Sequence, residues 1–278
     1  MSCRHEWRRG PYAGGNQMLI VQRRRIASAL WTPAAITTAL WLDAADASTV
    51  TTVSGAVSQW NDKSGNTRNA SQGTAGYRPA YSATGLNSKG VVSFDGTDDF
   101  MLTAAANYAA INYFIVCKLT PKENSSVFTA RTSPSANKGS ASDITVGLGF
   151  GLAGIPGDSN MSNIGGNASY AMTNGLPVSS LTSFNNFAVG VNCPADWFLF
   201  DMAITATVSG TKTFCLGADI FASIGSRHLP CQVAELIVTS AALSATVRQQ
   251  VQGYLAHKWG LTANLPNDHP YKTAAPTV

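Results

Sequence analysis

Short apolar runs separated by turn-forming residues extend along most of this chain. The clearest runs cover residues 40–43, 53–60, 91–94, 100–103, 113–119, 127–131, 144–150, 187–192, 197–208, 213–217 and 233–239. Gly, Asn and Asp interrupt them, for example at 61–66 and 95–98. This spacing is typical of antiparallel strands joined by tight turns and unlike the strand–helix alternation of βαβ units. The pattern therefore predicts an all-β, antiparallel two-sheet sandwich.

One helix is predicted near the C-terminal end, over residues 244–259. Ser244 suits the N-cap position and Gly260 suits the left-handed residue that ends a helix. Between them, apolar residues recur mostly at steps of three and four: Val247, Val251, Tyr254, Leu255 and Trp259. We expect this side to pack on the sandwich. The side expected to face water carries Arg248, Gln249, Gln252 and Lys258.

Charge is unevenly distributed along the chain. Residues 1–25 contain six arginines against one glutamate, whereas the rest has 13 basic and 14 acidic residues. A nearly neutral body is not expected to bind nucleic acid, which requires a basic face. We predict an extended basic anchoring arm over residues 1–33 and one sandwich domain over 34–278. The residues expected to anchor the arm are Arg4, Trp7, Arg8, Arg9, Arg23, Arg24 and Arg25.

The segment after the arginines imitates a secretory leader, with 45–47 as a cleavage-like site. Polar residues and Pro33 interrupt the apolar stretch, so we expect an unprocessed chain. No run of 18 apolar residues occurs, and no membrane span is expected.

Five cysteines, an odd number without CxxC spacing, predict buried thiols and no zinc site. A Cys215–Cys231 bridge and a bond between subunits remain open alternatives.

Several segments, read in order, resemble laminin-G-like, concanavalin-A-like domains of the lectin/glucanase superfamily. They are LWLDAAD at 40–46, VSQWNDKSGN at 57–66, RP at 78–79, VVSFDGTDD at 91–99, VAELIV at 233–238 and YLAHKWGL at 254–261. The resemblance covers about residues 36–273 and implies a jelly-roll sandwich of the kind found in bacteriophage and bacterial surface proteins. We expect Trp41 and Trp60 to fill the core between the sheets.

The resemblance also raises the question of a metal and of catalysis. Related domains often hold calcium at a sandwich rim, and Asp95, Asp98 and Asp99 offer hard oxygen ligands, although EF-hand spacing is absent. We predict no cofactor and treat these three as weak calcium candidates. Hydrolases of this fold use two carboxylates, whereas Glu6, Glu123 and Glu235 are isolated in the sequence. No nucleophile or metalloprotease motif is present, so we predict that the chain is not an enzyme.

Sugar binding requires an exposed aromatic ring and a few polar groups for the hydroxyls. Trp197 beside Asp196 fits this need, and so does a loop whose candidates are Asp158, Asn160, Asn163, Asn167 and Tyr170. A plain polar surface loop is the competing interpretation.

The predicted function is that of a bacteriophage virion structural protein, a decoration, fibre or spike component. Its arm would dock on other virion proteins, and its lectin-like sandwich would bind host-surface polysaccharide, as a homo-oligomer on the virion. The alternative is a secreted, extracellular bacterial carbohydrate-binding module.

Overall fold

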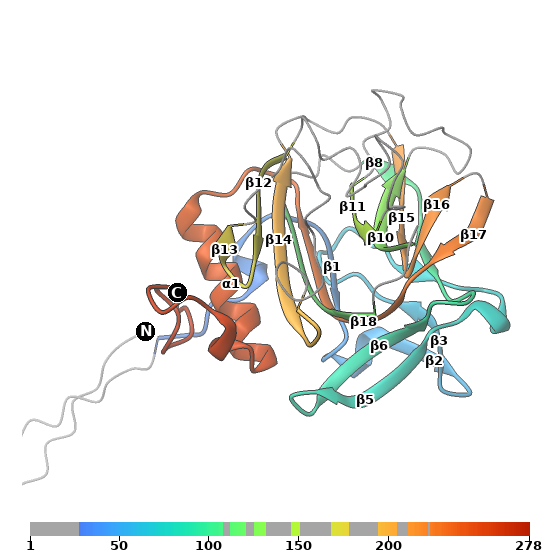
Figure 1. The fold of residues 1–278 in the computed structure, drawn as a ribbon, viewed down its shortest axis with the longest axis horizontal. Coiled ribbons are helices and arrows are strands. Elements are labelled where there is room, and N and C mark those ends of the chain that lie inside the picture. The colour runs from blue at the N-terminus through green and yellow to red at the C-terminus, as the bar shows by residue number, and fades with distance from the viewer. Residues whose placement is uncertain are drawn as a thin grey trace, which may run out of the picture.

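The computed structural model describes residues 28–107, 112–120, 125–131, 146–150, 168–177, 194–204, 211–221 and 223–278. Within them the chain forms antiparallel β-strands and one α-helix, α1 (Ala245–Trp259), near the C-terminal end (Figure 1). This confirms the predicted fold class, an all-β sandwich with a single C-terminal helix.

One layer of the sandwich is built around the long strand β18 (Pro230–Thr239). β18 pairs with β1 (Thr38–Asp43) and β6 (Lys89–Asp95), and also with β9 (Asn112–Leu119). Beyond β9 the layer continues through β14 (Phe198–Ile204), β12 (Ala168–Thr173) and β13 (Leu176–Pro177). All these pairings are antiparallel, as the spacing of the apolar runs predicted, although the β1–β18, β9–β14 and β9–β18 pairs join strands that are distant in the sequence.

The other layer centres on β15 (Thr211–Leu216), which pairs with β7 (Met101–Thr103), β8 (Ala106–Asn107) and β10 (Ser125–Arg131). The strands that continue it are β2 (Val50–Val53), β3 (Ala56–Trp60), β4 (Ala70–Ser71), β11 (Val146–Phe150), β16 (Ala218–Phe221) and β17 (Ser223–His228). β5 (Ala80–Leu86) pairs with β6 and touches β3 at one residue, and so links the two layers. Short 3-10 helices are η1 (Pro33–Ala35), η2 (Ala47–Thr49), η3 (Ala75–Tyr77) and η5 (Thr262–Asn264).

β9 shows how the sequence builds two separate apolar cores. Ile115 and Cys117 point between the layers, whereas Phe114 and Val116 point to the outer face, where α1 packs. A strand covered on both faces has no polar alternation, which explains its continuous apolar run. The same geometry corrects one expectation. Trp60 fills the core between the layers, but Trp41 lies in the outer core beneath α1.

The helix begins and ends where the sequence predicted. The Ser244 hydroxyl accepts a hydrogen bond from the Val247 N–H, and Gly260 ends the helix at φ 74°. Its expected water-facing side is partly wrong, because Gln252 is 2% exposed and Lys258 points into the protein. Both make polar contacts beneath the helix, so amphipathic spacing alone did not identify the buried face.

The two ends of the described chain are joined. The Trp31 N–H donates to the Pro276 carbonyl, and the Val278 N–H donates to the Ala29 carbonyl, at 2.9 Å each. The Trp31 ring is buried and meets Tyr254 of α1 edge-on at 6.0 Å between ring centroids. Both ends therefore lie on the same side of the molecule (Figure 1). The predicted anchoring residues Arg4 to Arg25 lie outside the described residues.

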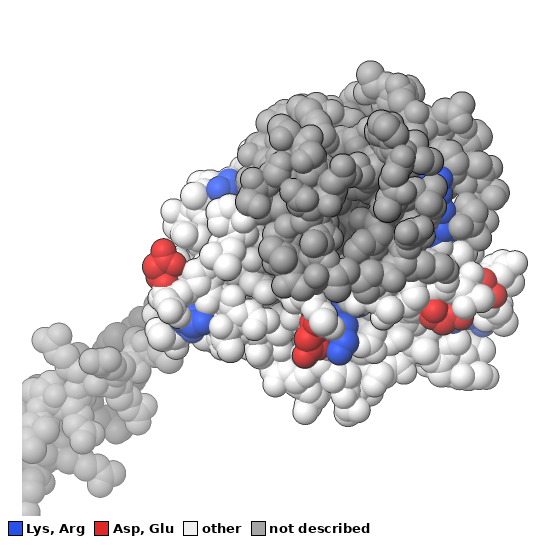
Figure 2. Space-filling view, in the orientation of Figure 1, with Lys and Arg blue, Asp and Glu red and all other residues white. Residues whose placement is uncertain are grey.

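Three cysteines, Cys117, Cys215 and Cys231, are buried free thiols, so the alternative Cys215–Cys231 bridge is not formed. No described helix is long and apolar enough to cross a membrane. On the face shown in Figure 2, the described basic and acidic residues are scattered among uncharged surface.

Candidate functional site

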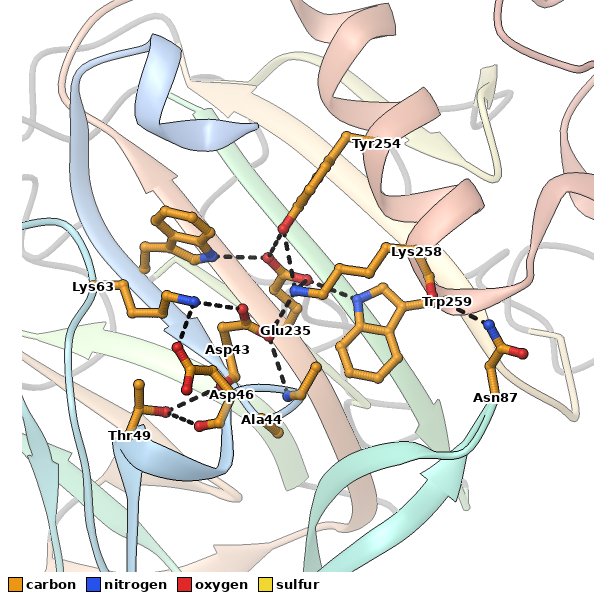
Figure 3. A network of polar contacts seen from close by, with 12 residues as sticks. Asp43, Ala44, Asp46, Thr49, Lys63, Asn87, Glu235, Tyr254, Lys258 and Trp259 are labelled. Atoms are coloured by element: carbon orange, nitrogen blue, oxygen red, sulfur yellow. Dashed lines mark hydrogen bonds and ion pairs between the residues drawn. The ribbon is translucent and has the colours of Figure 1, made fainter. Parts of the chain in front are cut away.

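A buried ionic network fastens α1 to the outer face of the sandwich (Figure 3). The Lys258 ammonium lies 2.6 Å from Asp43 Oδ1 and 2.7 Å from Glu235 Oε2. Lys63 reaches the other oxygen of Asp43 and also Asp46, at 2.9 Å each. Because Asp43 and Glu235 are directly opposed in the β1–β18 pairing, the strand register itself brings the two carboxylates together.

Glu235 is surrounded by donors. The indole N–H groups of Trp41 and Trp259 donate to Oε1 and Oε2 at 2.8 and 2.7 Å, and the Tyr254 hydroxyl donates to Oε1 at 3.1 Å. Complete burial raises the pKa of Glu235, and the Lys258 ammonium opposes that effect. A carboxylate with no exposed surface and filled acceptor positions has no room for a substrate.

This network therefore holds the helix in place. Glu235, which is isolated in the sequence, is fully buried beside Asp43 in the fold. The sequence did not predict this network because Asp43, Glu235 and Lys258 are not neighbours in the chain.

The three calcium candidates do come together in the turn after β6. Ligand oxygens of Asp95, Asp98 and Asp99 lie within 4.8 Å of one another. Two of the carboxylates already accept backbone hydrogen bonds: Asp95 Oδ1 from Thr97 at 2.7 Å, and Asp99 Oδ2 from the Asp95 N–H at 3.0 Å. Burial, with repulsion from Asp95 and Asp98, raises the pKa of Asp99 to about 6. These backbone hydrogen bonds explain why the three carboxyl groups lie close together: they stabilise the turn.

A surface depression of about 560 Å³ is the better candidate for a binding site. That volume lies in the range of roughly 300–1,000 Å³ for small-molecule sites. Its aromatic residue is the half-buried Trp197, and its polar residues are Asn174, Asp196 and Asn264. Leu86, Pro194 and Leu261 supply apolar wall. The depression thus combines an aromatic ring, amides and a carboxylate, the groups that sugar binding requires.

Tight turns place these side chains. Asn174 and Gly175, at φ 53° and 81°, form the two-residue turn between β12 and β13, where Asn-Gly is the favoured pair. Gly260 ends α1 and presents Leu261 to the depression. The β5–β6 turn beside Leu86 is held to the helix end, because Asn87 Nδ2 donates to the Lys258 carbonyl at 3.2 Å. Each wall is therefore fixed by local backbone geometry.

Asp196 stays ionised at the edge of the depression. The Lys118 ammonium, 3.0 Å away, and the Trp197 N–H both lower its pKa. The side chain of Asp196 is 80% exposed and that of Lys118 is 43% exposed. The pair leaves this edge with a balanced charge.

The structure places the sequence-predicted sugar residues unevenly. Trp197 lines the depression. Tyr170 lies in β12, paired with Ala203. Outside the described residues lie Asp158, Asn160, Asn163 and Asn167. Sequence reasoning missed Asn174 and Asn264. The Asn-Gly pair at 174–175 signals a hairpin turn, but no sequence signal places it beside Trp197.

No protein-family model matches the chain, and no curated protein matches it. Among solved structures, the chain is similar to the crystal structure of an arabinofuranosidase complexed with arabinofuranosyl-alpha-1,2-xylobiose. The likeness has 13% identity and a TM-score of 0.44, and it covers 71% of this chain. The chain spans about half the length of that protein, 50% of it being covered.

The comparison corrects one prediction. The expectation that the chain is not an enzyme is contradicted, because the matched structure is that of an enzyme, and we do not retain it. A likeness of this degree assigns no substrate and no catalytic residue to this chain. The antiparallel strands by themselves show an all-β sandwich.

Proposed function

We propose that this protein binds carbohydrate through the depression around Trp197. The observation that carries the proposal is the convergence of one half-buried tryptophan with Asn174, Asn264 and Asp196 in a single hollow. Pyranose rings present a C–H face that stacks on an aromatic ring, and their hydroxyls bind to amides and carboxylates. These residues come from three separate segments, so the fold assembles them.

A glycan array with the full chain tests this function. We expect binding to at least one polysaccharide or oligosaccharide, and Trp197→Ala should weaken it about tenfold, since roughly 1.4 kcal/mol of lost stacking gives that factor. The matched control is Tyr77→Ala, which removes a 42% exposed aromatic residue outside the depression. Silence across the array, or equal loss in both variants, would overturn the proposal.

Release of reducing sugar is measured on every bound polysaccharide. Cleavage that requires Trp197 would extend the proposal from binding to hydrolysis. Binding without cleavage would support the proposal as it stands.

We further propose that the sandwich is a laminin-G-like domain displayed on a bacteriophage particle through the basic N-terminal arm. Support comes from the composition of residues 1–25, six arginines with interspersed apolar residues, beside a nearly neutral remainder. Display in several copies, as in a homo-oligomer, raises the avidity of a weak sugar site without new contacts. The secreted bacterial carbohydrate-binding module is the second candidate, with the same site and a different carrier.

Removal of residues 1–27 distinguishes display on a particle from a secreted module. This deletion stops before Trp31, which packs on α1. Particle display predicts that the shortened chain binds glycan but no longer joins particles. A secreted module predicts that the full chain and the shortened chain bind glycan equally and that neither of them joins particles.

A further inference from the structure

The side-chain amides of Asn174 and Asn264 are held by different atoms, the first by its oxygen and the second by its nitrogen. Asn174 Oδ1 accepts a hydrogen bond from the Leu199 N–H at 2.9 Å, and the Asn174 N–H donates to the Leu199 carbonyl at 2.7 Å. The residue is thus fixed on β14 at both its backbone and its side chain. With Oδ1 engaged, the group that Asn174 offers to the depression is its Nδ2, a donor.

Asn264 is held the other way round. Its Nδ2 donates to the Trp197 carbonyl at 3.3 Å, which also ties η5 to the segment before β14. Oδ1 is then the acceptor that Asn264 can present to a ligand, and Nδ2 keeps a second N–H. The depression therefore offers one oriented donor and one oriented acceptor, together with the Trp197 ring and apolar wall from Leu86 and Leu261.

Resting on the proposed function, we propose that the depression selects sugars that carry an acetamido group, the N-acetylhexosamines. The acetamido carbonyl accepts from Asn174 Nδ2, its N–H donates to Asn264 Oδ1, and its methyl group contacts the apolar wall. The pyranose ring stacks on Trp197. A hydroxyl in the same position reaches one amide and leaves the other without a partner, which costs affinity.

Charge at the edge argues for a neutral ligand. Asp196 is ionised and already neutralises Lys118, so an acidic sugar finds no unpaired cation there and meets a carboxylate. A sugar with a free ammonium group brings donors alone, and these oppose the Asn174 donor.

Three trisaccharides with the same β-1,4 backbone test the inference on the full chain. Chitotriose carries acetamido groups, cellotriose carries hydroxyls and the chitosan trimer carries ammonium groups at the same carbon. N-acetylgalactosamine and galactose form a second pair. We expect at least tenfold tighter binding of the acetamido member in one or both sets, measured by titration calorimetry. Equal affinity for acetamido and hydroxyl members would overturn the inference and leave carbohydrate binding intact. Absence of binding to any member, with other glycans bound on the array, would also overturn it. Silence on the array as well would overturn the proposed function.

The substitution Asn174→Asp replaces the donor by an acceptor while keeping the oxygen that bonds Leu199. It should reduce the acetamido preference about tenfold. Asn267→Asp is the matched control. Asn267 is an exposed asparagine near the C-terminus that does not line the depression. Loss of preference in the control, or its retention in Asn174→Asp, contradicts the assignment. If Asn174→Asp does not fold, the comparison of ligands on the unmodified chain still decides.

Discussion

Lys258 of α1 places its ammonium 2.7 Å from Glu235 Oε2, and the Glu235 side chain has no exposed surface. The lysine is 15% exposed and also bonds Asp43, which the β1–β18 register sets beside Glu235. Asp43 has a second cation partner in Lys63, so Glu235 is the carboxylate that depends on Lys258. Removing Lys258 leaves the buried Glu235 carboxylate without its cation partner.

Replacing Lys258 by methionine should lower the free energy of unfolding by about 3–5 kcal/mol, the usual cost of breaking a buried pair. Urea denaturation measures it. The control Lys118→Met breaks an exposed pair with Asp196 and should cost less than about 1 kcal/mol. Adding Glu235→Gln to Lys258→Met should recover part of the loss. Equal effects of the two single substitutions would contradict the role assigned to the network.

Titration of the Asp99 carboxyl should make the stability of the protein depend on pH. Its pKa is about 6 in the folded chain, raised mainly by burial, against 3.8 for an ordinary aspartate. The folded state thus binds this proton more tightly than the unfolded state does. The stability it contributes is complete below about pH 3.8 and is lost as the pH rises through about 6.

Asp99→Asn should remove that loss, making the variant more stable than the parent above pH 6. We expect roughly 1–2 kcal/mol, less than the shift alone would give, because water screens a carboxyl that is not fully buried. Thermal unfolding from pH 4 to pH 7 measures the difference. An unchanged slope in Asp99→Asn would be evidence against the raised pKa.

Alanine substitutions at two glycines distinguish the cost of backbone strain from the cost of side-chain crowding. Gly217 and Gly55 have φ values of 80° and 82°, but a Cβ on Gly217 would lie 2.1 Å from a ring carbon of Phe94, whereas one on Gly55 meets nothing within 4 Å. Gly55→Ala should cost about 1 kcal/mol from its left-handed backbone. Gly217→Ala should cost an additional 1–3 kcal/mol or so from overpacking. Chemical denaturation of both variants isolates the steric part, and equal losses would contradict it.

Trp31 should contribute to stability although it lies in the segment that we assigned to the arm. It is 5% exposed, whereas its neighbour Leu30 is 68% exposed. Trp31→Ala should cost about 3 kcal/mol or more, and Leu30→Ala less than about 0.5 kcal/mol. Melting temperatures of the two variants test this contrast, which disappears if residues 29–31 do not pack on the body.

The sequence predicted most strands and the helix because both depend on local patterns. Residues 113–117 are continuously apolar, and Gly260 marks the helix end with a left-handed turn. β5 was missed because most of its residues are exposed, so it has no apolar run to detect. The interpretation of Trp41 was wrong for a related reason. Alternation separates Trp41 from Leu40 and Leu42 but does not say which face lies between the layers.

The candidate site was predictable only in part. Trp197 and Asp196 are adjacent and were recognised by their chemistry, whereas Asn174 and Asn264 reach the same depression from distant parts of the chain. The Asp43–Lys258–Glu235 network has the same origin, because its members meet only after β1 pairs with β18. Contacts that depend on strand register and on packing of the helix carry no local signal.

The pairing of residues 29–31 with 276–278 has a mechanical consequence. Tension on the chain that precedes residue 28 acts first on the two backbone hydrogen bonds that join Ala29 and Trp31 to the tail. Next it acts on the Trp31 ring, which packs in the outer core beneath α1 and not in the core between the layers. A load on this end can peel a short segment while the sandwich and the depression keep their shape.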